Sequence, residues 1–132
     1  MGDPPLPRGM HIGEVAARTE LSLRTLRHWD DVGLLQPSAR TEAGYRLYTE
    51  KDVETILVIR RMKPLGFSLE EMADVMTEIS KLRQPDQDPT ETANAIRRLT
   101  RILDQAKERR IKLRQQFHMA EEFIDLLTQE LS

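Results

Sequence analysis

The stretch that decides the fold lies at residues 21–35 and reads LSLRTLRHWDDVGLL. Ser22 stands where a helix N-cap is expected, because its side-chain oxygen can accept a backbone N–H of the following turn. Gly33 stands just past the end of the same segment, where a C-cap glycine is common. Between them apolar residues recur at three-residue steps: Leu23, Leu26 and Trp29. The pattern predicts a helix over residues 23–32 with one apolar face.

A second short helix precedes this one. Residues 10–12 read as a short extended entry, and residues 13–19 then place Val15 and Ala16 on an inner face. Two short helices joined by a tight turn form a helix-turn-helix, the motif whose second helix carries polar and arginine side chains to the edges of DNA bases. We therefore expect the arginine-bearing helix at residues 23–32 to be a recognition helix.

A β-hairpin wing is predicted at residues 40–48, which read RTEAGYRLY. Gly44 can supply the positive φ that a tight turn needs, and the residues after it are aromatic and tolerant of strand geometry. The hairpin follows the helix-turn-helix directly, so the two together predict a winged helix-turn-helix.

Two capping boxes introduce two further helices. Thr49 with Asp52 starts a third helix, which Pro64 and Gly66 end. Ser68 and Glu71 form the Ser-x-x-Glu box of a fourth helix. That box is followed by an apolar stripe at helical spacing: Met72, Val75, Met76 and Ile79.

Residues 81–90 are polar and contain two prolines, which predicts a linker before a long helix at residues 91–132. Alternating three- and four-residue steps define what we call the heptad seam: Ile96, Leu99, Leu103, Ala106, Arg110, Leu113, Phe117, Ala120, Ile124, Leu127 and Leu131. A helix of about 35 residues is about 50 Å long, more than a small domain covers, so the seam predicts a homodimer. The alternative is an ordinary amphipathic helix packed on the winged domain. Residues expected at the dimer contact are Leu99, Leu103, Ala106, Arg110, Leu113, Phe117, Ala120 and Ile124.

Arg110 is the polar position of the heptad seam. It either fixes the register by penalising other alignments or turns its charge out to solvent, and the sequence leaves both readings open.

Composition narrows the class of protein. The net charge of −2 and pI of about 5.9 give no overall basic excess. The chain has no cysteine, which excludes disulfides, thiolate zinc sites, iron–sulfur clusters and a cysteine nucleophile. Neither His11 nor His118 has another potential metal ligand at helical or hairpin spacing, so we expect neither metal nor cofactor. Residues 1–9 form a proline-rich leader without the apolar core of a signal peptide, and no apolar run approaches about 20 residues, so we expect a cytoplasmic protein without a membrane span.

Two other classes fit less well. An enzyme is not expected, because the chain lacks a phosphate-cradling glycine motif, a His-Glu-x-x-His helix and a local Ser-His-acid set. A coiled-coil adapter would use the long helix but would leave the arginine-bearing second helix and the wing unexplained.

The motifs resemble the MerR family of bacterial transcriptional regulators. The resemblance rests on IGEVA at residues 12–16, LSLRTLRHWD at 21–30, GLL at 33–35, GYRLY at 44–48 and GFSLEE at 66–71. It covers residues 10–79 by motif and the long helix by architecture. Where the family usually has two tyrosines after the recognition-helix arginine, this chain has His28 and Trp29, so ring N–H groups replace hydroxyls at the phosphate contact.

The resemblance implies a mainly α fold, with the domain at residues 10–80 bound to DNA and the long helices paired as an antiparallel coiled coil. The recognition helix is expected in the major groove, the wing against the backbone or minor groove, and the end of the third helix against phosphate. The predicted DNA contacts are Ser22, Arg24, Thr25, Arg27, His28, Trp29, Tyr45, Arg46, Arg60 and Lys63. Three alternatives stay open: an ion pair of Arg27 with Asp30 or Asp31, a partly core position for Trp29, and a core position for Tyr48.

Regulators of this kind bind a near-palindromic promoter operator as dimers and distort the duplex so that RNA polymerase can engage it. Activation and repression are both compatible with the sequence. The family's metal sensors use cysteines beyond the dimer helix, and this chain has none. We expect either regulation without an effector or a small ligand held between the long helix and the winged domain.

Overall fold

The computed structural model describes residues 9–84, 86 and 88–132. The chain packs into two compact units, one ending at Lys63 and the other spanning Pro64–Ser132. We call them the N-terminal unit and the C-terminal unit and describe each separately. The predicted leader at residues 1–9 falls outside the described residues except for Gly9.

The helix-turn-helix of the N-terminal unit is formed by α1 (Ile12–Thr19) and α2 (Leu23–Asp31). Between them Glu20 adopts the left-handed conformation, with φ of 57°, and ends α1. Ser22 then caps α2, because its hydroxyl oxygen accepts the Thr25 backbone N–H at 3.0 Å. Gly33 has a φ of 77°, as expected for the residue that ends this helix. The predicted motif is confirmed.

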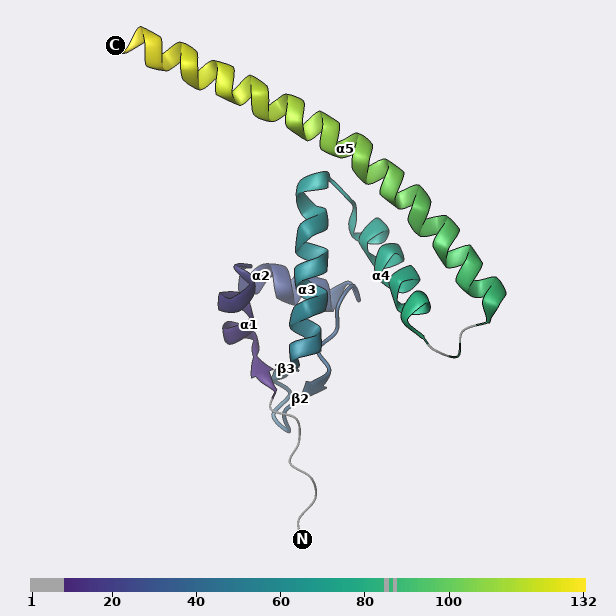
Figure 1. Ribbon diagram of the computed structural model, residues 1–132. Helices are drawn as coiled ribbons and strands as arrows, with labels where there is room; N and C mark the ends of the chain where they lie inside the picture. The colour runs from purple at the N-terminus through teal and green to yellow at the C-terminus, as the bar shows by residue number, and fades with distance from the viewer. Residues whose placement is uncertain (1–8, 85, 87) are drawn as a thin grey trace. The chain divides into compact units, whose positions relative to one another are not determined.

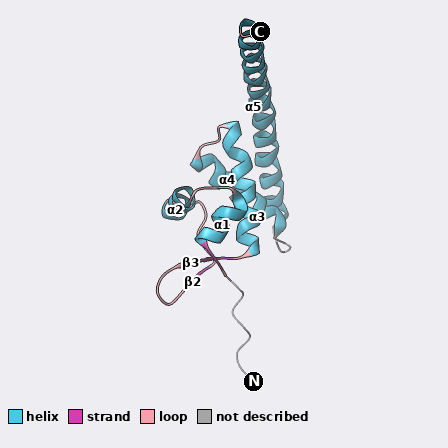
Figure 2. Cartoon of the chain, turned by 90° about the vertical axis from the view of Figure 1, so that its left-hand side faces the viewer, coloured by secondary structure: helices cyan, strands magenta, loops and turns pink. Residues whose placement is uncertain are grey.

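A three-stranded antiparallel sheet lies beside these helices. It consists of β1 (Met10–His11), β2 (Ala39–Arg40) and β3 (Arg46–Tyr48), in the order β1-β3-β2. The strands β2 and β3 form the predicted hairpin, and their loop extends away from the helices (Figure 2). The sequence predicted an extended segment at residue 10 but not its pairing with β3, where Met10 lies opposite Tyr48.

The core of the N-terminal unit joins the helices to the sheet. Its apolar and aromatic side chains with the least exposure are Val15, Leu26, Trp29, Tyr48, Ile56 and Ile59. The core position that the sequence allowed for Tyr48 is therefore confirmed. The last two residues belong to α3 (Glu50–Met62), which starts at the predicted Thr49 capping box and continues into the short helix η1 (Lys63–Leu65).

The C-terminal unit contains α4 (Leu69–Arg83) and α5 (Pro89–Glu130). The predicted Ser68 capping box starts α4, and Asp88 caps α5 with Pro89 in its first turn. In Figure 1, α4 lies along the first part of α5, and the rest of α5 continues beyond it. Met72 and Val75 of α4 and Ala95 of α5 are buried.

The domain boundaries differ from those predicted. The sequence placed a linker at residues 81–90 and grouped the fourth helix with the winged domain. In the structure α4 continues to Arg83 and α5 begins at Pro89, so that only residues 84–88 separate them. The packing division falls instead after Lys63, because α4 packs on α5.

Within the part of the chain that the structure describes, no helix is both long enough and apolar enough to cross a membrane. The same residues contain no group of three or more His, Cys, Asp or Glu side chains arranged to hold a metal ion.

Candidate nucleic-acid interface

The outer face of α2 carries the basic side chains predicted to read DNA. Arg24, Arg27 and His28 are exposed, whereas Leu26 and Trp29 point into the core. The two arginines make no hydrogen bond or ion pair with any residue that the structure describes. A guanidinium that has no intramolecular partner keeps its donors for a ligand, and guanine edges and phosphates are the acceptors it suits best.

The alternative ion pair of Arg27 with Asp30 or Asp31 is not formed. Both carboxylates are occupied by arginines from the wing instead. Arg27 is therefore exposed and has no ion-pair partner among the described residues.

Ser22 and Thr25 are held by the helix cap itself. Besides accepting the Thr25 N–H, the Ser22 hydroxyl donates to the Thr25 Oγ1 at 2.9 Å. Ser22 remains exposed and Thr25 is half-buried. Their first role is to start α2, and any contact with DNA would come in addition to it.

Trp29 is mainly a core residue. Its side chain is only 2% exposed, packed in the core of the N-terminal unit. The core position that the sequence allowed for Trp29 is confirmed, because the three-residue apolar step that predicted the helix also places Trp29 on the inner face. A phosphate contact by its ring N–H stays a prediction. His28 is the member of the pair that faces solvent.

A buried carboxylate connects α2 to the wing. Asp30 is 8% exposed and accepts hydrogen bonds from Arg46 Nε and, at 2.8 Å, from Arg40 Nη2. Burial by itself raises the pKa of Asp30, but the hydrogen bonds from the two arginines outweigh it and hold this pKa below its ordinary value. Asp31 adds a longer contact, with Arg46 Nη2 3.7 Å from its Oδ1.

The hydrogen bond to Asp30 gives Arg46 a structural role besides the predicted one. The sequence predicted a DNA contact, but its side chain is only 23% exposed and its guanidinium faces Asp30. The pKa of Arg46 is raised, first by the hydrogen bond to Asp30. Tyr45 differs, since it is 67% exposed next to the turn at Gly44. The wing thus presents Tyr45 outward while Arg46 fixes the wing to α2.

Sequence reasoning missed Arg40, and it named Asp30 only as a possible partner of Arg27, not as the residue that binds the wing. Arg40 lies in β2 and keeps 47% of its side chain exposed. Its place beside the predicted hairpin turn was a usable sign of a basic wing residue. Asp30 offered no such sign, because its partners lie 10 and 16 residues away along the chain.

At the end of α3 the two predicted phosphate contacts differ. Arg60 Nη1 donates to the Thr19 carbonyl at 2.7 Å and lies 3.9 Å from Glu20, so it satisfies the end of α1. Lys63 is exposed, and no ion pair joins it to the described residues. Of the two, Lys63 is the better placed for phosphate.

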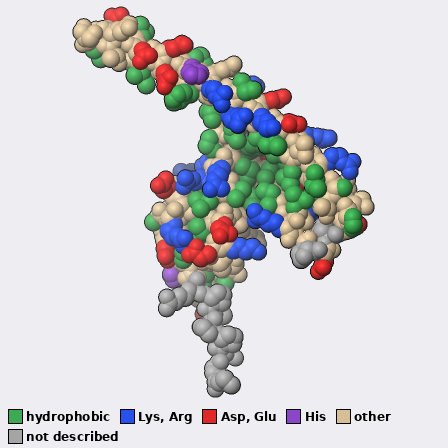
Figure 3. All heavy atoms as spheres, viewed as in Figure 1, with side chains coloured by type: hydrophobic (Ala, Val, Ile, Leu, Met, Phe, Trp, Pro, Cys, Tyr) green, Lys and Arg blue, Asp and Glu red, His purple; other side chains and the backbone are tan. Residues whose placement is uncertain are grey.

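The predicted dimer contact lies on α5. Towards α4 this helix buries Ala95 fully and Ile102 and Arg109 in part. Every residue from Arg110 onward is exposed, including the seam residues Leu113, Phe117 and Ile124. Hydrophobic side chains are uncovered along this end of α5 in Figure 3. The heptad seam is therefore a second face of the helix, only partly shared at Leu99 and Ala106 with the face that packs on α4.

Comparison with known proteins finds similarity to helix-turn-helix transcriptional regulators. The family described as "MerR HTH family regulatory protein" matches residues 10–79. An uncharacterised helix-turn-helix transcriptional regulator of Pseudomonas aeruginosa is 41% identical over 68 residues, which cover 52% of this chain and 52% of that protein. The transcriptional regulator CueR of Vibrio cholerae is 35% identical over 88 residues, which cover 67% of this chain and 58% of that protein.

A solved structure extends the likeness to the long helix. It is a MerR family transcriptional regulator from Bacillus cereus, with 31% identity, a TM-score of 0.59, and coverage of 92% of this chain and 81% of that one. By sequence, however, the chain spans about half the length of the curated relatives that it matches.

Proposed function

The chain belongs to the MerR family of helix-turn-helix regulatory proteins, and from this membership we propose that it regulates transcription by binding promoter DNA as a homodimer. The observation that carries the proposal is the division of α2 into two faces. One face is buried, and the other presents Arg24, Arg27 and His28 to solvent. Such a helix can enter a major groove without disturbing the core that holds it.

The proposed contacts divide into two kinds. Arg24, Arg27 and Thr25 read base edges, since arginine can bond a guanine edge through two donors and a short hydroxyl can bond several bases. Phosphate contacts position the protein but carry no sequence information. We assign these to Ser22, His28, Tyr45 and Lys63, with secondary contributions from the exposed parts of Arg40, Arg46 and Arg60.

The homodimer is proposed to form through the heptad seam of α5, with the two helices antiparallel as the family resemblance implies. From Arg110 to the end, this seam has no cover from any residue that the structure describes. Apolar residues repeating every 3.5 positions favour supercoiling with another helix. Two copies would place two recognition helices on one duplex, which matches a near-palindromic operator.

The proposed mechanism is distortion of the promoter. Bending or twisting DNA costs free energy that depends on its sequence, so it adds specificity at bases that the protein does not touch. A distorted promoter can present its elements to RNA polymerase in a new alignment, which allows activation or repression. This activity would take place in the cytoplasm, where promoter DNA and polymerase meet.

The test is a fluorescence anisotropy titration of the full chain with DNA from its own upstream promoter region and with a scrambled duplex, over a series of salt concentrations. We expect tighter binding to the promoter DNA and affinity that falls steeply with salt, because phosphate contacts release counterions. Binding to neither duplex at any salt concentration would contradict the proposal and favour the coiled-coil adapter.

A further inference from the structure

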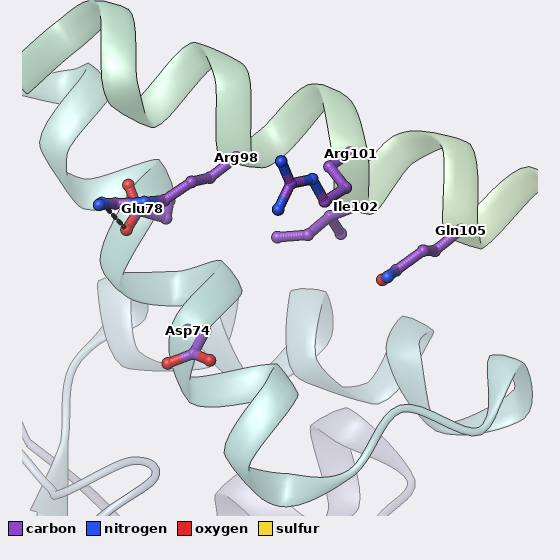
Figure 4. Close-up of a pocket in the computed structure, with 6 residues that line it drawn as sticks. All are labelled: Asp74, Glu78, Arg98, Arg101, Ile102 and Gln105. Atoms are coloured by element: carbon purple, nitrogen blue, oxygen red, sulfur yellow. Dashed lines mark hydrogen bonds and ion pairs between the residues drawn. The ribbon is translucent and has the colours of Figure 1, made fainter.

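A cavity of about 360 Å³ lies between α4 and α5, entirely within the C-terminal unit. It is lined by Asp74, Glu78, Arg98, Arg101, Ile102 and Gln105. Figure 4 shows the two acidic side chains on α4 and the other four on α5. The cavity therefore has an acidic wall and a basic wall, and its volume falls in the range of small-ligand sites, about 300–1,000 Å³.

Glu78 on the acidic wall is incompletely satisfied. The residue is 7% exposed, and its Oε1 accepts both Arg98 Nη1 at 3.0 Å and Lys81 Nζ at 3.5 Å. Its other oxygen, Oε2, is buried and has no hydrogen-bond partner among the described residues. A buried carboxylate oxygen without a donor is costly, so such atoms in native proteins usually meet a ligand, an ion or a water.

The basic wall has unused donors. Arg101 is exposed and makes no hydrogen bond or ion pair with any residue in the described part of the chain. Asp74 likewise has none, whereas Arg98 is already engaged with Glu78. The cavity thus offers an acceptor set on α4 and a separate donor set on α5, without a large net charge.

We propose that this cavity binds a small zwitterion, whose cationic end pairs with Glu78 and whose acidic end pairs with Arg101. A planar guanidinium or amidinium suits Glu78 best, because two parallel donors can engage both carboxylate oxygens once the side chain turns its buried Oε2 toward the cavity. Arg98 donates only to Oε1 and keeps 55% of its side chain exposed, so the cation of the ligand can take its place without leaving Glu78 unpaired. Ile102 packs on the aliphatic part of the ligand, and Gln105 supplies a further polar contact.

The site goes beyond DNA binding, and it lies where α5 meets α4. The proposed dimer contact uses another face of the same helix. A ligand that ties α4 more tightly to α5 would therefore act on the element that pairs the two copies.

The test uses 4-guanidinobutyrate as the zwitterionic probe, titrated into the full chain by isothermal titration calorimetry. Butylguanidine lacks the acid and butyrate lacks the cation, so the three probes separate the two ends. Glu78→Gln removes the charge of the acidic wall and keeps its shape, and Arg101→Gln does the same for the basic wall. Arg97→Gln is the matched control, since Arg97 bonds Asn94 and does not line the cavity.

We expect the unsubstituted chain to bind 4-guanidinobutyrate and each of the two cavity variants to bind it about tenfold more weakly, the loss of one charge-assisted hydrogen bond. Arg97→Gln should bind as the unsubstituted chain does. Butylguanidine should depend on Glu78 but not on Arg101. Circular dichroism checks that each variant folds. Arg101→Gln alters only an exposed side chain, so it still tests the site if Glu78→Gln fails to fold.

Three results would overturn the proposal: no binding of 4-guanidinobutyrate, equal binding of all three probes, or equal losses in Arg97→Gln and Arg101→Gln. The titration contains no DNA. Its outcome is therefore independent of whether the chain binds a promoter.

Discussion

Arg24 and Arg27 are the residues on which sequence reading depends in our proposal. Replacing either with alanine should cost about 1–3 kcal/mol of binding to the preferred duplex and relax the preference at one position, because an arginine bonded to a base edge discriminates among bases. Thermal stability should not change, since both side chains are exposed and unpaired within the described chain. Anisotropy titrations against a set of single-base variants measure the effect. An unaltered sequence profile in both variants would reject base reading by α2.

Arg46→Ala is the informative contrast. It removes a side chain that is bonded to Asp30, so we expect weaker binding to all duplexes alike, together with a loss of stability. The two effects share one cause, the release of the wing from α2. A stable protein with uniformly weakened binding would instead assign Arg46 to phosphate alone.

Asp30 is a buried charged residue that joins α2 to the wing. Asp30→Asn should lower the free energy of unfolding by about 1–3 kcal/mol, because two arginines lose their charged acceptor at a buried position. Urea denaturation measures the change. The control is Asp31→Asn, whose carboxylate is 70% exposed and should matter little.

The same substitution should change the dependence of stability on pH. The folded-state pKa of Asp30 lies below its ordinary value of 3.8. A depressed pKa contributes stability that is fully present above the unfolded-state pKa and is lost as pH falls through the folded-state pKa. The difference between the unsubstituted chain and Asp30→Asn should therefore be constant near neutral pH and shrink below about pH 4. A difference that grows with acidity would contradict this assignment.

Among the helices, α4 shows how one capping residue can serve two purposes. Glu71 accepts the Ser68 backbone N–H at 2.9 Å through Oε1, and its Oε2 accepts Arg109 Nη2 of α5 at 3.1 Å. Arg109 also lies over the Phe67 ring, with its Cζ 4.2 Å from the ring centroid. The start of α4 is thus tied to the middle of α5.

Glu71→Ala should lower the free energy of unfolding by about 1–2 kcal/mol, because it removes the reciprocal half of the capping box and the partner of Arg109. The neighbouring Glu70→Ala is the control, since Glu70 is exposed in the same first turn and forms no ion pair within the described residues. Thermal unfolding measures the loss of stability in both variants. Equal effects would mean that the charge of the first turn matters and the specific contacts do not.

At the scale of the assembly, the proposed homodimer forms along the exposed end of α5. Leu113→Asp places a charge in the heptad seam and should yield monomers with much weaker operator binding, because a charge cannot be buried there without a partner. Ile111→Asp is the matched control: Ile111 is 55% exposed, two residues away and on the opposite side of the helix. Sedimentation velocity measures both. A dimer in Leu113→Asp, or monomers in both variants, would reject the seam.

The elements that local chemistry encodes could be predicted from the chain. The cap of α2 by Ser22, the two capping boxes and the positive φ of Gly33 and Gly44 all involve residues within a few positions of one another. Their hydrogen bonds and steric preferences act before any tertiary contact forms. The same local periodicity separated Leu26 and Trp29 from Arg24 and Arg27, and so located the proposed reading face of α2.

What the sequence could not supply are the contacts between distant residues. The carboxylate of Asp30 meets Arg40 and Arg46 because the sheet folds back on α2. The pairing of β1 with β3, the grouping of α4 with α5 and the two charged walls of the cavity have the same origin. Helical periodicity states which residues share a face, but packing decides what that face meets. Trp29 and Arg46 illustrate the difference, since one is buried and the other is bonded inside the protein, although both occupy positions where the family pattern implied contact with DNA.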